Sequence, residues 1–544
     1  MEARAREVVR IGNKMFANKR NVDSLWQEIA LNFYPERADF TTKRDDGEEF
    51  SDHLFSSYPV LARRELGNLF ASNLRPRTQK WFSIHTEDEK LDEGNEERKY
   101  LDRLSDIQWR AMYDPPAQFV RATKEADHDF AAFGNAVIKS SPNIAGDGLL
   151  YVNYHLRDNA WAENAEGVVD CNHRNWTPTA RQLKHHFGDK VSSEVTKAFA
   201  KDPEKTFPCR HIVMPSRLYE YKSKSGKEFP FISLYVELES ETILEEVGLS
   251  YFCYNVPRWQ TVSGSQFGRS MATGIALPDG RTMQTVLRVL REAGEKYVDP
   301  PMIATMDAIR SDLALYAGGV TTADSEYDEK LGEVLRPISQ NSGGMPIGFE
   351  IASALREDIR AAFFLDKIQL PEISTEMTAF EVRRRIEQHV RSAAPLFEPI
   401  EADYNQPLCK NSFHILQEGG AFGPMDDMPE SLRGAQIRYS FRSPVHDMAD
   451  QNEAEIFTSV MQTIFAPAAQ IDPAQIENVD LTEASRDAAR AAGWKSTWFK
   501  PKEAVEQRRA QMAKQAEMEQ QMQGMDMAAG IAEKGGKAIK SVSG

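Results

Sequence analysis

The chain has little cysteine and no long apolar run. Of its 544 residues only four are cysteine: Cys171, Cys209, Cys253 and Cys409. They are too few and too scattered for a disulfide framework, so free thiols in a reducing compartment are expected. No run of about 18 apolar residues occurs, which argues against a transmembrane helix and a membrane partner. The first residues lack the apolar segment of a secretory signal, so we expect the protein to work where ribosomes make it.

Positive charge is also in short supply. The chain has 82 acidic and 66 basic residues, a formal net charge of −16. Proteins that grip duplex DNA tightly neutralise its phosphates with a basic surface. Tight non-specific DNA binding is therefore not expected, although a local basic patch could still touch DNA. An acidic surface also suits a protein that must let DNA pass without sticking.

The common catalytic motifs are missing. The sequence contains no G-x-x-x-x-G-K-[ST], G-x-S-x-G, H-E-x-x-H or G-x-G-x-x-G pattern. Its carboxylates form no spaced set that resembles a two-metal nuclease cluster more than chance would supply. We therefore expect no enzyme activity and no cofactor. If the protein works beside an ATP-driven machine, the ATPase is another chain.

The remaining composition is that of a folded protein with more than one core. Hydrophobic residues make up 41% and charged residues 27%, and a chain of this length predicts two to four substructures. Helical patterns cover residues 1–37, 54–74 and 86–130. Short strand-like runs occur at 149–156, 167–173, 211–215, 231–238 and 243–247, with helical interruptions at 179–187 and near 193–200. Because helices and strands are segregated by region, the fold class is α+β.

Two amphipathic helices of similar length are predicted at 279–298 and 348–368. Their apolar positions recur with helical spacing, and are Met283, Val286, Leu287, Leu290, Ala293, Gly294 and Tyr297 in the first, and Ile351, Leu355, Ile359, Ala362 and Phe363 in the second. Leu277-Pro278-Asp279-Gly280 predicts the start of the first helix and Asp299-Pro300-Pro301 its end. The pair fits either a stalk that carries residues 300–347 as a cap or an ordinary helical hairpin inside a globular core.

A loop and a strongly capped helix follow. Pro371 prevents residues 369–377 from continuing the helix. Thr378 and Glu381 then form a capping box, and loss of the Thr378 hydroxyl should cost the helix about 1 kcal/mol. Arg383, Arg384 and Arg385 lie on this helix as a solvated face or, repeated around a ring of subunits, as a positive belt.

The C-terminal part is mostly helical in pattern. Prolines at 395, 399 and 407 break or kink the helical run that continues to Leu416. Residues 443–500 are again helical in pattern. From Glu503 the chain is rich in Gln, Met, Ala and Lys, which predicts a helix that frays into a disordered tail.

Two short patterns deserve testing as chemical sites. Cys171-x-His173 and Cys209-x-His211 each place a thiol and an imidazole on one face of a strand, so neighbouring strands could present four zinc ligands. The spacing is not that of common zinc sites, and cysteine in a strand also serves as a small apolar residue. His185-His186 fits either a solvated helix face or a catalytic pair.

Several blocks, in order along nearly the whole chain, resemble the head-to-tail connector, or portal, proteins of short-tailed, T7-like bacteriophages. The blocks are Leu54-Phe55-Ser56-Ser57-Tyr58-Pro59, residues 66–74 with Trp81-Phe82, Phe133-Gly134-Asn135-Ala136, Pro257-Arg258-Trp259, Phe267-Gly268-Arg269-Ser270, Ala276-Leu277-Pro278-Asp279, Met377-Thr378-Ala379-Phe380-Glu381-Val382, and Ser443-Pro444 ahead of the Gln/Met/Ala/Lys-rich end. The most specific are those between 257 and 279.

The resemblance implies a portal architecture that forms a ring. It assigns residues 1–267 to a wing, 268–298 and 348–368 to two stem helices, and 299–347 to a clip. Residues 369–377 become a channel loop, in which Glu372, Ile373, Ser374, Thr375, Glu376 and Met377 are the residues of interest. Residues 378–424 become a long wing helix and its return, 425–502 a crown, and 503–544 a polar tail.

The implied function is a homo-oligomeric ring, commonly of twelve subunits, at one capsid vertex. Double-stranded DNA would pass through the ring without sequence specificity during packaging and ejection. Implied partners are capsid and scaffolding proteins, terminase, and later tail adaptor and nozzle proteins, with the protein in the virion and, during assembly, in the host cytoplasm. Two alternatives stay open: a metal-dependent nucleic-acid enzyme that uses the Cys/His pairs, and an internal capsid scaffold.

Overall fold

The computed structural model describes residues 2–45, 47–77, 79–88, 94–219, 228–304, 335–337, 344–368, 399–441, 457–471 and 480–491, with a few positions beyond them. The chain divides into two compact units. The first contains Met1–Arg77 and Arg110–Ala421, and the second contains Thr78–Trp109 and Phe422–Gly544. None of the helices in these described residues is long and apolar enough to cross a membrane.

The first unit begins with helical segments, which are α1 Glu2–Phe33, η1 Pro35–Arg37, α2 Tyr58–Leu74, η3 Pro115–Ala117 and α4 Phe119–Phe133. Proline in the first turn of α2 is pre-set for helical geometry. α4 ends at Gly134, which has a φ of 70° and is the left-handed residue that commonly terminates helices.

Two antiparallel sheets follow. The larger has strand order β4-β5-β6-β7-β8, so each strand pairs with the next along the chain, and the smaller has order β3-β2-β9. The strands are β2 Ile138–Pro142, β3 Leu149–Asn153, β4 Asn159–Glu163, β5 Val169–Trp176, β6 Cys209–Pro215, β7 Phe231–Glu237, β8 Thr242–Leu249 and β9 Tyr254–Asn255. The five strand-like runs predicted above are present as β3, β5, β6, β7 and β8.

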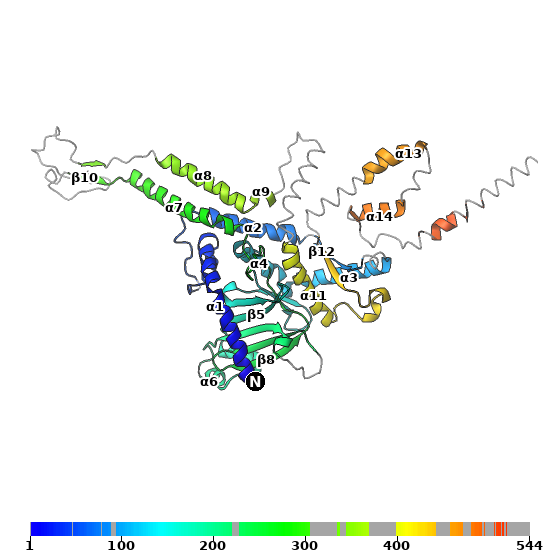
Figure 1. Cartoon of the computed structure of the whole chain (residues 1–544), viewed down its shortest axis with the longest axis horizontal. Coiled ribbons are helices and arrows are strands. Elements are labelled where there is room, and N and C mark those ends of the chain that lie inside the picture. Colours follow the sequence, from blue (N-terminus) through cyan, green and yellow to red (C-terminus); the bar gives the residue numbers. More distant parts are fainter. Residues whose placement is uncertain are drawn as a thin grey trace, which may run out of the picture. The chain divides into compact units, whose positions relative to one another are not determined.

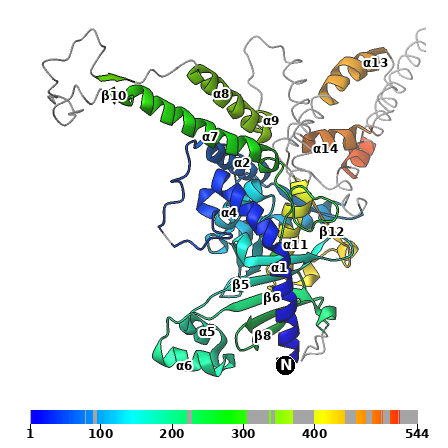
Figure 2. The same ribbon diagram turned by 60° about the vertical axis from the view of Figure 1, so that its left-hand side comes forward.

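The five-stranded sheet is covered on both faces. On one face, Ala5, Val8 and Val9 of α1 pack against apolar residues of β6 and β7. On the other face lie α5 Ala180–Phe187 and α6 Ser193–Lys201, at the two places where helical interruptions were predicted (Figure 2). A capping box between Thr179 and Gln182 fixes the start of α5. Short 3₁₀ turns η4 Leu156–Asp158, η5 Gly188–Lys190 and η6 Ser216–Leu218 join these elements.

The two predicted amphipathic helices form an antiparallel pair, α7 Thr273–Val298 and α8 Met345–Ala362 (Figures 1 and 2). Two boundaries were predicted wrongly. The first helix starts at Thr273 and not near Asp279, because the Ser270 hydroxyl accepts hydrogen bonds from the N–H groups of Ala272 and Thr273, and the helix then tolerates Pro278 inside its early turns.

The second predicted helix does not run unbroken to Ile368. Phe364 has a φ of 55°, which interrupts α8 before the short α9 Leu365–Ile368. Beyond α7, β10 Met302–Ala304 pairs antiparallel with β11 Leu335–Pro337. Further on, the π-helix η10 Glu401–Asn405 leads into α11 Gln406–Glu418. This π-helical turn lies directly before Pro407, which lacks an N–H, so the regular α-helical hydrogen-bond pattern is interrupted there, whereas Pro395 lies outside the described residues.

The second unit contains a strand pairing that was not predicted. β1 Phe82–Thr86 pairs antiparallel with β12 Ile437–Phe441, about 350 residues later in the chain. α3 Asn95–Tyr113 begins in this unit, and the Gln108 side chain accepts a hydrogen bond from the Tyr439 hydroxyl at 2.9 Å. The remaining elements are η11 Met425–Asp427, η12 Glu430–Leu432, η13 Met461–Phe465, α13 Ala466–Ile471 and α14 Leu481–Ala491.

Candidate functional site

The α7–α8 pair is joined by a narrow apolar seam. Met283 and Leu290 of α7 are buried, as is Ile359 of α8. A Cβ atom added to Gly348 would lie only 2.6 Å from Leu290 Cδ2, so the two helices approach each other closely at this level. The apolar faces predicted from helical spacing therefore meet in part, while Tyr297 and Ile351 of those faces remain exposed.

Away from the seam the pair leaves large apolar side chains in solvent. Val289, Tyr297, Ile347 and Phe349 are 54–61% exposed and Ile351 is 44% exposed. Contiguous exposed apolar surface on a protein commonly marks an interaction site. Within the described chain the pair is thus a projecting element, and the alternative of an ordinary hairpin inside a globular core is wrong.

The root of α7 is a close crossing of two backbones. A Cβ on Gly134 would lie 2.1 Å from the carbonyl carbon of Arg269, so only glycine fits. The side chain of Asn135 donates to the carbonyl of Gly268 at 2.7 Å and accepts from its N–H at 2.9 Å. The N–H of Trp259 donates to the carbonyl of Gly134 at 2.9 Å. Blocks that are separate in the sequence therefore meet at one point.

Two hydroxyl groups extend this junction into the helix. The Ser270 hydroxyl donates to the carbonyl of Ala131 at 2.7 Å, and the Thr273 hydroxyl donates to that of Ala132 at 2.6 Å. Both carbonyls belong to the last turn of α4, where helix carbonyls lack intrahelical partners. The start of α7 is in this way fixed to the end of α4.

Aromatic rings fix the C-terminal end of α8, where the pair returns to the body of the first unit. The ring of Trp259 stacks on Phe130 at 5.6 Å and meets the edge of Phe70 at 5.2 Å, and Phe364, at the break after α8, lies 6.4 Å away. Both ends of the projecting pair are therefore attached to α2 and α4.

The segment before α2 braces the flank of α7. The Gln284 side chain accepts from the N–H groups of Phe55 and Ser56 at 2.8 Å each and donates to the carbonyl of Ser56 at 3.0 Å. Nearer the body, a Cβ on Gly280 would lie 2.9 Å from the ring of Phe33, at the end of α1.

A buried ion pair holds η10, the turn before α11, against α4 and the end of α2. The Arg75 guanidinium pairs with Asp127 and donates to Asn405 Oδ1 at 2.9 Å, and Tyr404 donates to Asp127 at 3.0 Å. Burial alone would lower the pKa of Arg75, but the adjacent Asp127 carboxylate raises it above the usual value, so the guanidinium stays charged. Removing one partner would strand the other charge in the interior.

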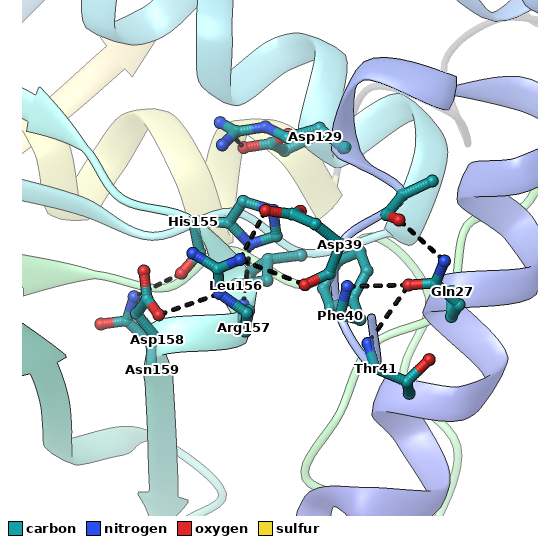
Figure 3. Close-up of polar contacts among 12 residues, drawn as sticks. Gln27, Asp39, Phe40, Thr41, Asp129, His155, Leu156, Arg157, Asp158 and Asn159 are labelled. Carbon is teal, nitrogen blue, oxygen red and sulfur yellow. Dashed lines mark hydrogen bonds and ion pairs between the residues drawn. The ribbon is translucent and has the colours of Figure 1, made fainter. Parts of the chain in front are cut away.

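A second polar cluster ties the turn after α1 to residues 155–159 (Figure 3). Asp39 pairs with His155 at 2.7 Å and with Arg157. Burial would raise the pKa of Asp39, but hydrogen bonding and charge from His155 and Arg157 outweigh it and lower the pKa to about 2. Nearby, the Lys19 ammonium, fully buried, donates to the carbonyls of Leu156 and Asn159 at 2.6 and 2.7 Å.

The zinc hypothesis is contradicted by strand register. Residues that are directly opposite in an antiparallel pair point to the same face, and His211 lies opposite Arg174 while His173 lies opposite Ile212. The two Cys-x-His pairs therefore face opposite sides of the sheet. Cys171 packs against α1 and Cys209 against α5. In the described residues no group of three or more potential ligands is placed to hold a metal, and all four cysteines, which lie there, are buried free thiols.

His185 and His186 lie exposed in the last turn of α5, so the solvated-face interpretation is confirmed. They border a hollow of about 470 Å³ whose other lining residues are Arg174, Trp176, Arg181, Gln182 and Tyr235. The remaining predicted site residues lie outside the described residues. They are Glu372, Ile373, Ser374, Thr375, Glu376, Met377, Thr378, Glu381, Arg383, Arg384 and Arg385.

Comparison with known proteins identifies the family to which the chain belongs. The family model of bacteriophage head to tail connecting proteins matches residues 6–498. The chain belongs to this family. Connector-family relatives include the probable portal protein of Bordetella phage BPP-1, which is 24% identical over 85% of this chain and 82% of its own length. The portal protein of Salmonella phage epsilon15 is 23% identical over 93% of this chain and 90% of its own.

The chain was also matched to chains of solved gene transfer agent (GTA) particles. A chain of the native GTA virion is 10% identical over 78% of this connector-family chain and 86% of its own, with a TM-score of 0.29. A chain of the neck of the empty GTA particle is 11% identical over 77% and 88%, with a TM-score of 0.31.

The contact between the segments at Gly134 and Gly268 was not predicted from the sequence. Both glycines stand in the blocks that carried the family resemblance, but nothing local in the sequence shows that two glycines about 130 residues apart touch. The signal that could have suggested it is the pairing of small residues with Asn135, whose amide can satisfy one N–H and one carbonyl together.

Proposed function

We propose that copies of this chain form a closed ring that serves as the portal at one capsid vertex. Double-stranded DNA passes through its channel during packaging and ejection, and the ring docks terminase first and tail proteins later. The observation that carries the proposal is the match to the connector family over residues 6–498, joined to a helical pair whose apolar side chains remain exposed in the single subunit. A neighbouring copy would cover them.

Imaging the purified protein along its axis tests this directly. We expect rings with a central opening, and a particle mass that is an integer multiple, about twelvefold, of the subunit mass of 61.5 kDa. A protein that stays monomeric under every assembly condition, with or without capsid and scaffolding proteins, would count against the ring and the portal function together.

The finer division of the subunit is part of the same proposal. Residues 1–267 form the wing, and residues 268–298 and 348–368, which contain α7 and most of α8, form the stem. Residues 299–347 form the clip that faces terminase and then the tail adaptor and nozzle proteins, and residues 425–502 form the crown. The projecting α7–α8 pair, with its root attached to α2 and α4, supports the stem assignment. Crosslinks from residues 299–347 to terminase would test the clip, and their absence in an active packaging complex would contradict it.

Residues 369–377 are proposed as the loop that projects into the channel, with Arg383, Arg384 and Arg385 as a basic belt. Thr378→Pro removes the capping-box helix start and should impair DNA packaging more than ring formation. Packaging at the normal rate in this variant would contradict the loop assignment.

The role proposed is structural, with no catalytic step in this chain. The Cys/His pairs, which carried the enzyme alternative, point to opposite faces of the sheet. The internal-scaffold alternative predicts that the protein is absent from mature particles, whereas the portal remains in the virion. Mass spectrometry of purified virions separates these two outcomes.

A further inference from the structure

The helix α8 has two exposed flanks, one on each side of its seam with α7, and the two flanks differ in charge. At about 100° per residue, Ile347, Ile351 and Asp358 fall along one flank of the seam. Phe349, Arg356 and Arg360 fall along the opposite flank. All six are exposed.

Contacts of the first flank show where it lies on the pair. Asp279 of α7 is on the same side as Asp358, and burial together with the nearby Asp358 carboxylate raises the pKa of Asp279. In the described chain neither carboxylate forms a salt bridge. We call the surface formed by Asp279, Asp358, Ile347 and Ile351 the acidic side.

On the second flank, Arg360 forms an ion pair with Asp366 of α9 at 2.6 Å, and the other neighbour is Tyr58, the first residue of α2. Arg356 and Arg360 are close enough to Tyr58 for electrostatic interaction, and Gln284 of α7 binds the backbone at Phe55 beside it. We call the surface formed by Phe349, Arg356 and Arg360 the basic side. The two sides therefore flank the α7–α8 pair in opposite directions.

The two sides match each other level by level. Asp358 falls between Arg356 and Arg360 along α8, and Phe349 falls between Ile347 and Ile351. Ile347 and Phe349 are each 59% exposed and Ile351 is 44% exposed. Rotation about a ring axis brings the same level of adjacent copies together, so each group on one side would meet its complement on the other.

We propose that the acidic side of one copy docks on the basic side of the next, with Phe349 inserted between Ile347 and Ile351 of its neighbour and Arg356 facing Asp358. This inference rests on the proposed ring and specifies its stem interface. The contact is heterologous, because it joins two different faces, and such a contact generates a ring when the rotation between copies closes, and not a two-fold dimer. A second copy is the fitting occupant because this one helix carries both halves of the contact.

Charge reversal on either side tests the interface. Asp358→Lys makes both sides basic, and Arg356→Glu places acidic groups on both. Each variant alone should lower the fraction of subunits in rings about tenfold or more, because like charges then meet at every junction. Mass photometry measures this fraction, and circular dichroism shows that both variants are folded. Glu357→Lys, a reversal on the back of α8, is the matched control and should assemble like the wild type.

An equimolar mixture of Asp358→Lys and Arg356→Glu should restore rings. In alternating order, the lysine at position 358 meets the glutamate at position 356, and the next junction is the native pair of Asp358 and Arg356. Rings formed by each variant alone at the wild-type level, or a mixture of folded variants that forms no rings, would overturn the interface while the proposed portal function stands. A wild type that never forms rings would instead overturn the portal function.

Discussion

At the scale of single residues, the attachment of α7 depends on the absence of a side chain at Gly134. Gly134 combines a φ of 70° with a position where a Cβ would lie 2.1 Å from the Arg269 backbone. Backbone atoms cannot rotate away as a flexible side chain can. The junction therefore tolerates no side chain at this point, whatever its chemistry.

We expect Gly134→Ala to lower the free energy of unfolding by about 3 kcal/mol or more, since conformational strain and a steric clash add. Gly264→Ala is the matched control: its φ is 86°, but no atom lies within 4 Å of the added Cβ. It should cost only the left-handed strain, about 1–2 kcal/mol. Urea unfolding measures both, and equal losses would show that the close crossing is not what constrains Gly134.

The carboxylate of Asp39 makes the free energy of unfolding depend on pH. Its pKa falls from 3.8 in the unfolded chain to about 2 in the folded one. Between these two pKa values the unfolded chain binds a proton at Asp39 that the folded chain does not bind. The ionised carboxylate therefore contributes about 2 kcal/mol to the free energy of unfolding above pH 4, and this contribution is lost as the pH falls toward 2. His155 and Arg157 lie against Asp39 in Figure 3 and are the physical source of the effect.

Asp39→Asn should accordingly destabilise the protein by about 2 kcal/mol at pH 7 and by progressively less as pH approaches 2. Urea unfolding at a series of pH values measures the difference between variant and wild type. Asp45→Asn, which changes an exposed carboxylate in the same connection, should stay within about 0.5 kcal/mol throughout. A difference for Asp39→Asn that does not vary with pH would contradict the assignment.

At the scale of elements, helical periodicity located α7 and α8 because apolar spacing reports directly on which face is covered. Their ends were missed for a tertiary reason. Ser270 caps α7 only because its hydroxyl is also held by the carbonyl of Ala131, and α8 breaks at Phe364, where the ring packs near Trp259. Pro278 predicted a helix start near Asp279, but tertiary contacts that cannot be recognised from the sequence place the start of α7 earlier.

Register explains a second failure at this scale. Each Cys-x-His pair was correctly placed on one face of its own strand, but which face depends on how β5 and β6 pair. A shift of one residue would have placed both pairs on the same side. The pairing of β1 with β12 in the second unit was likewise beyond local pattern, because its two short strands are far apart in the chain.

The seam between α7 and α8 should behave as a local unit of stability. Ile359→Ala removes a fully buried side chain and should lower the free energy of opening of α8 by about 3 kcal/mol. Hydrogen exchange read by mass spectrometry should speed up in residues 345–362 with no change in β7. Val289→Ala, on the exposed flank of α7, should change neither region in the monomer. Equal acceleration in β7 would mean that the seam is not a separate unit.

At the scale of the whole molecule, the blocks that carried the family resemblance converge in space. Residues 133–136, 257–259 and 267–270 all meet where the α7–α8 pair joins the body of the first unit. Their spread over about a quarter of the chain follows from topology, because the large sheet is inserted between α4 and α7. The family could therefore be recognised from sequence, whereas the junction that these blocks build required coordinates.

The net charge of −16 per subunit gives the last prediction. A ring of such subunits should bind a short DNA duplex no more tightly than a dissociation constant of about 10 μM at physiological salt, because few phosphates can be neutralised. Fluorescence anisotropy of a labelled duplex measures this. At low salt, residual affinity should fall when Arg383, Arg384 and Arg385 are all changed to Gln, provided that they form the proposed belt. Submicromolar binding by the wild-type ring at physiological salt would show that the DNA path is strongly basic, and a passage that DNA crosses without adhering would then be excluded.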